Sequence, residues 1–467
     1  MVKRGSAQSK IKQTNKTKTV TAVGQDESRR NLMDKLVSLA KRRGFIFPGS
    51  EIYGGLANSW DYGPLGAELK KNIKDEWWRR FVRQRPDVVG LDAAILMNPK
   101  VWEASGHVSG FNDPLVECKE CHERWRADQV EGDKCSNCGW ELMAAKQFNM
   151  MMGTHAGPVE SVGNFVYLRP ETAQAMFVDF KLVQEAMRRR LPLGIAQMGK
   201  AFRNEITPGN FIYRLREFEQ MEIEYFVKPT DWEKYFEHWL EEMKAWLKHL
   251  GVSSKHLHYR EIPDGERAHY SQRTVDIEYD YPFGQKELYG LAYRGDFDLK
   301  QHQQHSGQDF TYTDPENPKE KFLPHVIEPT WGVDRSVLVV LLEAYHEEKA
   351  PTSEAGESAT RVVMKFPSWL APIKVAVLPL SKKAELAKLA RPLFEDLGKN
   401  FTCEYDETQS IGKRYRRQDE IGTPFCVTVD FDSLKDKAVT VRERDTMKQE
   451  RIEMKKLADY LKNALGE

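Results

Sequence analysis

Two charged segments stand close together near the middle of the chain. Residues 201–205 read Ala-Phe-Arg-Asn-Glu, and residues 214–222 read Arg-Leu-Arg-Glu-Phe-Glu-Gln-Met-Glu. Apolar and charged residues alternate in both segments, and residues 207–210 between them are typical of a turn, so we expect an antiparallel hairpin. Arginine forks suit phosphate oxygens, and carboxylates suit an ammonium group. The hairpin therefore indicates a site for a nucleotide beside an amine.

Other charged residues stand at predicted helix starts. Pro170 suits the first turn of a helix, and Glu171 suits its positive end. Arg335 lies just before an apolar helix predicted at 337–345, and an arginine at a helix N-terminus suits a phosphate group. Residues 50–66 are rich in glycine and aromatic residues, which predicts a rigid loop rather than a helix or strand. Taken singly, each segment also fits an ordinary cap or turn.

Four of the six cysteines form two Cys-x-x-Cys pairs, which residues 122–134 separate: Cys118, Cys121, Cys135 and Cys138. This spacing predicts a tetrahedral zinc site, structural in role because four thiolates leave no open position. The alternative is a pair of disulfides or four unrelated thiols, which a reducing compartment disfavours. Cys403 and Cys426 lie far away and are predicted to be ordinary small apolar residues.

The composition is that of a soluble protein with several domains. The 467 residues are 40% hydrophobic and 30% charged, which suits two or three domains with an extensive polar surface. We find no apolar run of the ~20 residues that a membrane helix needs and no secretory signal, so we expect a cytoplasmic protein with no membrane partner. The net charge is zero, which does not exclude an RNA-binding face, and residues 413–417 form a basic cluster.

Hydrophobic periodicity predicts the main elements. Helices are expected at 31–43, 65–83, 230–250 and 382–397 and from about 447; strands are expected at 88–97, 373–378, 401–405 and 425–430. The aromatic stripe of the helix at 230–250 is expected to be core. Residues 351–358 are polar and predict a linker or exposed loop.

Together these segments resemble the glycyl-tRNA synthetases of the bacterial homodimeric type, which are class II aminoacyl-tRNA synthetases. The likeness runs from about Leu32 to the C-terminus. Residues 65–99 resemble motif 1 (the dimer element), 202–205 motif 2, 332–335 motif 3, 51–58 and 169–174 the signatures of the glycine enzymes, and 410–424 their anticodon-binding domain.

The resemblance implies an α+β fold. Residues 29–368 would form the class II catalytic domain, with an antiparallel sheet flanked by helices, a zinc-knuckle insertion at about 112–147 and a helical insertion at about 229–262. Residues 369–467 would form an α/β anticodon-binding domain with a largely parallel sheet, and residues 1–28 a disordered basic tail. The implied activity is that of a homodimeric glycine–tRNA ligase, which joins glycine to tRNA(Gly) through a glycyl-adenylate, with ATP and Mg²⁺.

The resemblance also assigns the site. Arg203 and Arg335 would be catalytic, gripping the α- and γ-phosphates, while Phe218 stacks on adenine. The ATP-binding residues would be Arg203, Asn204, Glu205, Tyr213, Arg214, Leu215, Arg216, Glu217, Phe218, Glu287, Leu288, Arg294, Gly332, Val333, Asp334 and Arg335. The glycine-binding residues would be Lys100, Glu171, Glu205, Phe218, Glu219, Gln220, Met221, Glu222, Glu328, Pro329, Thr330, Trp331 and Gly332.

The chain departs from the family pattern at three positions. Thr330 stands where serine is usual, Ala175 where glycine is usual, and Lys100 where arginine is common. Two alternatives remain open at this point. One is a non-catalytic class II-like accessory protein that binds nucleic acid, although such proteins usually lose the motif arginines. The other is a synthetase for another amino acid, although three acidic residues around the amine leave little room for a side chain.

Overall fold

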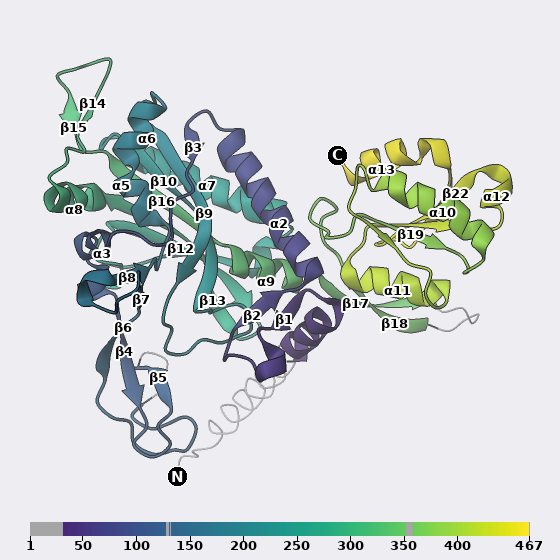
Figure 1. Ribbon diagram of the computed structural model, residues 1–467, viewed down its shortest axis with the longest axis horizontal. Coiled ribbons are helices and arrows are strands. Elements are labelled where there is room, and N and C mark those ends of the chain that lie inside the picture. The colour runs from purple at the N-terminus through teal and green to yellow at the C-terminus, as the bar shows by residue number, and fades with distance from the viewer. Residues whose placement is uncertain (1–30, 128–129, 131, 352–357, 467) are drawn as a thin grey trace, which may run out of the picture.

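The structure, a computed structural model, describes the chain except for residues 1–30, 128–129, 131, 352–357 and 467 (Figure 1). The tail predicted at 1–28 and most of the linker predicted at 351–358 lie outside the described residues. The described part begins with a helix over residues 31–43, as the sequence predicts. None of the helices in this part of the chain has the length and apolarity that crossing a bilayer requires.

A seven-stranded sheet forms the centre of the larger part of the molecule (Figure 1). In spatial order its strands are β11 (Leu257–Glu261), β12 (Arg273–Tyr281), β13 (Gly284–Gly295), β16 (His325–Gly332), β10 (Glu217–Val227), β9 (Leu193–Phe202) and β3 (Val88–Gly90). All neighbours are antiparallel except β3 and β9. The predicted antiparallel catalytic sheet is confirmed, and so is the hairpin, in which β9 and β10 pair from Phe202 and Glu217 onward.

One face of this sheet is covered by three helices: α2 (Pro64–Trp78), α7 (Trp232–His249) and α9 (Val333–Ala344). Successive residues of a strand point to opposite faces, so Met221, Ile223 and Tyr225 of β10 pack into this core. Trp239 and Trp246 of α7 are fully buried there, which confirms that the aromatic stripe is core. The segment 229–262, predicted as a helical insertion, also supplies the edge strand β11, so it completes the sheet instead of standing apart from it.

Shorter elements surround the other face of the sheet. They are α3 (Pro99–Ala104), α4 (His107–Gly110), β7 (Met152–His155), β8 (Phe165–Leu168), α5 (Ala173–Val178), α6 (Phe180–Ala186), α8 (Phe297–Ser306), β14 (Tyr312–Thr313) and β15 (Lys321–Phe322). The knuckle projects from the same part of the molecule on the three-stranded sheet of β5 (Arg124–Arg126), β4 (Asn112–Glu117) and β6 (Lys146–Asn149) (Figure 1).

Two predictions near the start of the chain need correction. The segment 50–66 is not a loop throughout, because β2 (Trp60–Tyr62) pairs with β1 (Ile46–Pro48) and α2 begins at Pro64. The strand predicted at 88–97 ends at Gly90. Beyond it the backbone N–H of Ala93 donates to the Gln197 side chain instead of to a neighbouring strand, so the ladder cannot continue.

A smaller α/β unit follows the hairpin of β17 (Tyr345–Pro351) and β18 (Ser358–Met364). Its elements are β19 (Val375–Pro379), α10 (Ala384–Leu397), β20 (Cys403–Tyr405), α11 (Ile411–Ile421), β21 (Phe425–Val429), α12 (Ser433–Asp436), β22 (Ala438–Glu443), β23 (Gln449–Glu453) and α13 (Leu457–Leu465). The sheet order is β20-β19-β21-β22-β23, parallel across the first two pairings and antiparallel across the last two.

The C-terminal helix predicted from about 447 is therefore wrong in its start. Residues 449–453 form the edge strand β23, and the helix begins at Leu457. β23 is mostly exposed and carries charged side chains, so its sequence lacks the apolar alternation of a strand, and pairing with β22 overrides its weak local preference.

Candidate active site

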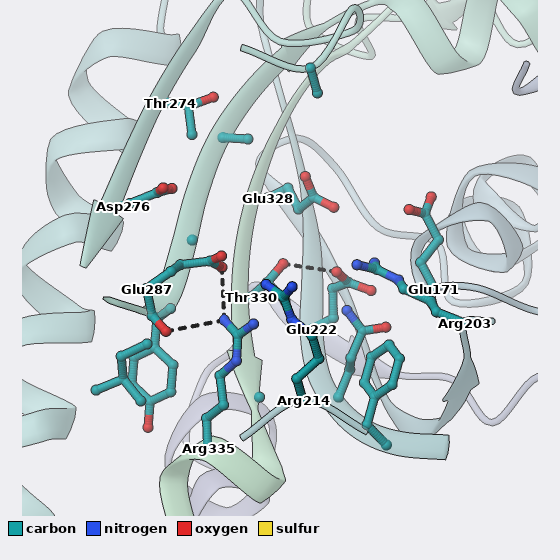
Figure 2. Close-up of a pocket in the computed structure, with 18 of the residues that line it drawn as sticks. Glu171, Arg203, Arg214, Glu222, Thr274, Asp276, Glu287, Glu328, Thr330 and Arg335 are labelled. Atoms are coloured by element: carbon teal, nitrogen blue, oxygen red, sulfur yellow. Dashed lines mark hydrogen bonds and ion pairs between the residues drawn. The ribbon is translucent and has the colours of Figure 1, made fainter. Parts of the chain in front are cut away.

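A cavity of about 510 Å³ opens on the face of the sheet that α2, α7 and α9 leave free (Figure 2). β10, β13 and β16 form its floor. The predicted site residues that line it are Glu171, Arg203, Glu205, Tyr213, Arg214, Leu215, Phe218, Glu219, Gln220, Glu222, Glu287, Leu288, Glu328, Thr330, Gly332, Asp334 and Arg335. Segments far apart in the sequence thus contribute to one site.

Three guanidinium groups, those of Arg335, Arg214 and Arg203, follow one another across the cavity (Figure 2). Arg335 is paired with a carboxylate oxygen of Glu287 at 3.2 Å. The guanidinium of Arg203 lies 5.2 Å from the ring centroid of Phe218, and its Nε donates a 3.0 Å hydrogen bond to the Pro170 carbonyl. A row of separately anchored guanidinium groups suits a chain of phosphate groups.

Two carboxylates stand together at the Arg335 end of the row, Asp276 on β12 and Glu287 on β13 (Figure 2). Burial, with further contributions from Glu287 and Glu278, raises the pKa of Asp276 to about 7. Such a pair of carboxylates beside a phosphate site suits a divalent cation, which takes oxygen ligands. Asp276 was missed from the sequence, although Thr274 and Asp276 alternate with apolar residues and so share one face of β12.

Three glutamates, Glu171, Glu222 and Glu328, surround the Arg203 end (Figure 2). Glu222 accepts hydrogen bonds from the hydroxyls of Thr330, at 2.8 Å, and of Thr172. Three acceptor groups around a small space suit an ammonium ion.

The three glutamates differ in pKa because their partners differ. Burial raises the pKa of Glu171, but His107, 3.3 Å away, and Arg294 outweigh burial and hold it well below its ordinary value. Burial and the nearby Glu171 raise the pKa of Glu222. Burial also raises the pKa of Glu328 to about 8, in opposition to Arg294.

The structure corrects the predicted role of Arg294. Its side chain is 1% exposed and does not line the cavity. Its Nε donates to Asp298 at 2.7 Å, and its Nη1 donates to both oxygens of Glu328 at 3.0 and 3.1 Å. Because its donors are directed at these two carboxylates, Arg294 supports the glutamate site and does not contact a nucleotide.

Several other predicted residues are also outside the cavity wall. Strand alternation turns Met221 and Trp331 into the helix-covered core, and Val333 is buried there as well. The others that do not line it are Lys100, Asn204, Arg216, Glu217 and Pro329. Glu219 reaches the cavity but its carboxylate binds Lys70 of α2 at 2.8 Å, so it is not available to an amine.

The sequence reading also missed wall residues from the knuckle, from β12 and from the segment before it. Those with polar side chains are Arg126, Arg260, Glu266, Arg267, Tyr270, Thr274 and Asp276. They lie more than 40 positions from the charged hairpin or on edge strands, and no local pattern joins them to it.

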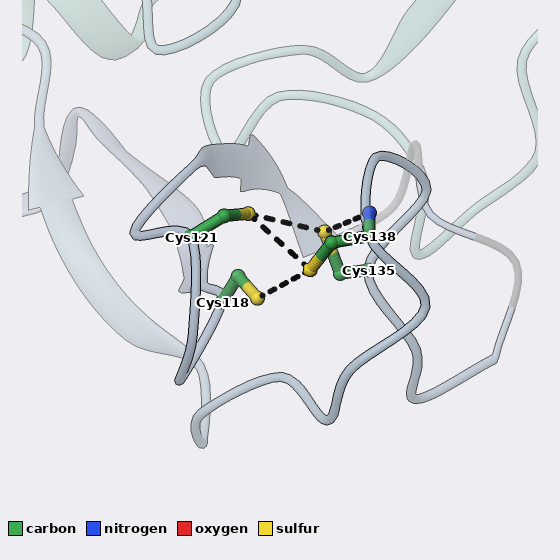
Figure 3. Close-up of side chains that lie close together, drawn as sticks. All are labelled: Cys118, Cys121, Cys135 and Cys138. Atoms are coloured by element: carbon green, nitrogen blue, oxygen red, sulfur yellow. Dashed lines mark hydrogen bonds between the residues drawn. The ribbon is translucent and has the colours of Figure 1, made fainter.

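The four knuckle cysteines converge (Figure 3). Sulfur–sulfur distances are 3.4 Å for Cys118 and Cys138, 3.6 Å for Cys121 and Cys135, and 3.5 Å for Cys121 and Cys138. Four thiolates 2.3 Å from one zinc ion would lie about 3.8 Å apart, so the cluster fits tetrahedral zinc. Backbone N–H groups of residues 121 and 120 outweigh desolvation and lower the pKa of the Cys118 thiol to about 6, which favours the ligating thiolate.

Comparison with known proteins agrees with this architecture. Residues 160–345 match the family model of the tRNA synthetase class II core domain (G, H, P, S and T), and residues 374–464 match that of the anticodon binding domain. The fold and the site define a class II tRNA synthetase.

Curated relatives narrow the class. The chain is 52% identical over 466 residues to the glycine–tRNA ligase of Geobacillus thermodenitrificans (strain NG80-2), covering 94% of this chain and 98% of the relative. It is 53% identical over 458 residues to that of Bifidobacterium longum (strain NCC 2705), covering 93% of each. The chain belongs to the glycine–tRNA ligase family, which confirms the resemblance seen in its motifs.

Proposed function

We propose that this protein is a glycine–tRNA ligase (EC 6.1.1.14), which activates glycine with ATP and transfers it to the 3′ end of tRNA(Gly). One observation carries the proposal. The row of Arg335, Arg214 and Arg203 ends beside Glu171 and Glu222, so that a triphosphate and an amino acid would meet at Arg203 (Figure 2).

The chain's own residues would position the first step. Arg203 holds the α-phosphate next to the glycine carboxylate, and Arg335 holds the γ-phosphate at the far end. Phe218, under the Arg203 guanidinium, offers its ring to adenine. The glycine carboxylate attacks the α-phosphorus in line, which requires no protein nucleophile. Catalysis is then positioning together with stabilisation of the charge on the phosphoryl group.

Asp276 and Glu287 are the residues that would hold Mg²⁺ with ATP. The high pKa of Asp276 supports this fit, because it marks a partly buried carboxyl group without a cation of its own beside it. Mg²⁺ bound with ATP neutralises charge on the phosphate oxygens.

Glycine is selected by exclusion. Glu171, Glu222 and Glu328 would receive the ammonium group, while Thr330 and Glu328 form the wall beside the α-carbon. Attraction alone distinguishes a missing methyl by only ~1–3 kcal/mol, so rigid walls are the better device. The Glu328 carboxylate is fixed by two contacts from Arg294, which makes that wall stiff.

The C-terminal unit would bind the anticodon, and residues 369–467 are assigned to it. Within the basic cluster, Arg414 is buried and donates to the carbonyls of Pro379 and Asp406, so its role is structural. Lys413 is exposed and Arg416 half-buried on the same helix, and both are placed to meet RNA. We further propose a cytoplasmic homodimer built on the motif 1 segment 65–99, with a structural zinc ion in the knuckle.

The test is ATP–pyrophosphate exchange by the purified protein with glycine, alanine and serine, followed by charging of tRNA(Gly). Exchange with glycine alone and glycine-dependent charging are expected. Folded, zinc-loaded protein that exchanges with none of the three would contradict the proposal and favour the non-catalytic accessory protein. Light scattering on the same sample measures the mass of the assembly.

A further inference from the structure

A fourth glutamate, Glu224, lies directly beneath the floor of the glutamate site. It is on β10 with the same orientation as Glu222, and it is fully buried. The register that pairs Glu222 with Thr330 and Tyr225 with Ile327 sets Glu224 opposite Glu328 on β16. Carboxylate oxygens of Glu222, Glu224 and Glu328 lie within 4.8 Å of one another.

Glu224 differs from its neighbours in having no hydrogen-bond partner on either carboxylate oxygen. Glu222 accepts from two threonine hydroxyls, and Glu328 accepts twice from Arg294. A buried carboxylate without a donor is very costly, and the usual outcome is that it keeps its proton.

The charged groups that face Glu224 come from three other elements and from its own strand. They are Glu328 of β16, Arg294 of β13, Asp298 of α8 and Glu222 of β10. Three of the four are acidic, and the donors of Arg294 are directed at Asp298 and Glu328. Burial and these carboxylates hold the pKa of Glu224 well above its ordinary value.

We propose that Glu224 is a positioning residue for the glycine site, whose carboxylic acid donates a hydrogen bond to the Glu328 carboxylate from below. Each Glu328 oxygen has two lone pairs, and Arg294 occupies one on each. A donor from Glu224 uses another and leaves the cavity side of Glu328 for the substrate. Glu224 itself does not line the cavity, so it acts only through Glu328. This inference rests on the proposed role of Glu328 beside glycine.

The proton has a consequence for the charge of the site. With Glu224 neutral, the ammonium group of glycine meets three ionised glutamates partly balanced by Arg294. Were Glu224 also ionised, four carboxylates would repel one another around one small cavity. The neutral acid keeps Glu328 in place without adding to this repulsion.

Two variants separate a proton donor from a buried charge and from mere packing. Glu224→Gln keeps the shape and a neutral donor, so we expect KM for glycine and its pH profile to stay within about threefold of wild type in pyrophosphate exchange. Glu224→Met keeps the volume without a donor, so we expect KM for glycine to rise about tenfold while KM for ATP is unchanged. A rise with Gln as large as with Met, or a wild-type KM with Met, overturns the proposal.

An infrared difference spectrum between wild type and Glu224→Gln provides a readout that needs neither glycine nor activity. A protonated carboxyl band present in wild type and missing from the variant is the expected result, and its absence overturns the proposal even where Glu224→Met does not fold. If wild-type protein shows the band but no glycine exchange, the proposed function of the site fails while the proton on Glu224 stands.

Discussion

Thr330 and Glu222 face each other across β16 and β10, and the Thr330 hydroxyl donates a 2.8 Å hydrogen bond to Oε1 of Glu222. A β-branched side chain has few χ1 rotamers, so this bond fixes the methyl group as well as the hydroxyl. The same residue therefore supports a carboxylate for the substrate amine and adds a fixed wall to the cavity that it lines.

Removing that methyl should widen the choice of amino acid. In Thr330→Ser the bond to Glu222 is kept, and we expect kcat/KM for glycine to stay within about threefold while the alanine-to-glycine ratio rises about tenfold. Thr330→Val keeps the volume and loses the hydroxyl, so KM for glycine should rise about tenfold with alanine still excluded. Exchange assays with both amino acids measure this. An unchanged alanine ratio in Thr330→Ser would remove Thr330 from the wall.

Arg203 should be indispensable for adenylate formation. Its replacement by alanine removes a cation from the point where charge develops, and we expect exchange to fall by at least ~10²-fold with the fold intact. Arg190→Ala is the matched control, because this arginine is exposed and paired only with Glu316 at 3.0 Å. Near-normal exchange in Arg203→Ala, with circular dichroism like that of the control, would contradict the assignment.

Local patterns predicted the parts of the fold whose signal lies within one segment. The alternation at 201–222 gave the β9–β10 hairpin, and the stripe of Trp239 and Trp246 gave α7, because burial of one face imposes a period. The paired cysteines gave the knuckle because a metal shell imposes a spacing. The seven-stranded order came only through the resemblance, since pairing of distant strands has no local signature.

The missed site residues follow the same physical division. Asp276 belongs to the site because β12 packs beside β13, and Arg294 leaves it because Asp298 lies one helical turn further along the chain, within reach of its fork. Neither relation can be read from residue type. Glu224 looks like any charged residue on a strand, and only the register with Glu328 shows its role.

Zinc should hold the knuckle together. We expect about one zinc ion per chain, lost in Cys121→Ser because three thiolates bind far more weakly than four, with proteolysis then cutting within 112–147. Cys403→Ser is the matched control, since Cys403 lies in β20 far from the cluster. Metal analysis and limited proteolysis check both variants. Full zinc content in Cys121→Ser would show that this residue is not a ligand.

The stability of the ligand-free protein should depend on pH through Asp276. Its pKa of about 7 in the fold lies above that of an unfolded aspartate, about 3.9. Its contribution is therefore fully present below about pH 4 and is lost as the pH rises through about 7. Asp276→Asn stays neutral, so we expect its Tm to gain on wild type between about pH 4 and 8, measured by calorimetry without ATP or Mg²⁺. A constant difference across that range would place the titration elsewhere.

The last prediction concerns Arg361 of β18, which joins the two units of the protein. Its side chain is 0% exposed, and its Nη1 donates to Asp419 of α11 at 3.0 Å while its Nε donates to Glu348 of β17 at 2.7 Å. Asp419 is held as well by Arg442 of β22 at 2.8 Å. The hairpin that follows the catalytic helix α9 is thus tied to the anticodon-binding unit by a buried ionic network.

Breaking a buried pair from one side leaves an uncompensated charge, which costs about 3–5 kcal/mol. We therefore expect Arg361→Met to lower the Tm of the C-terminal unit in calorimetry by several degrees, and to reduce tRNA charging more than pyrophosphate exchange, because the anticodon-binding unit is held less firmly against the catalytic sheet. Arg391→Ala is the control, since Arg391 is 58% exposed and its pair with Glu407 should contribute at most ~1 kcal/mol. Equal Tm values for the two variants, or equal losses of charging and exchange, would show that Arg361 does not couple the units.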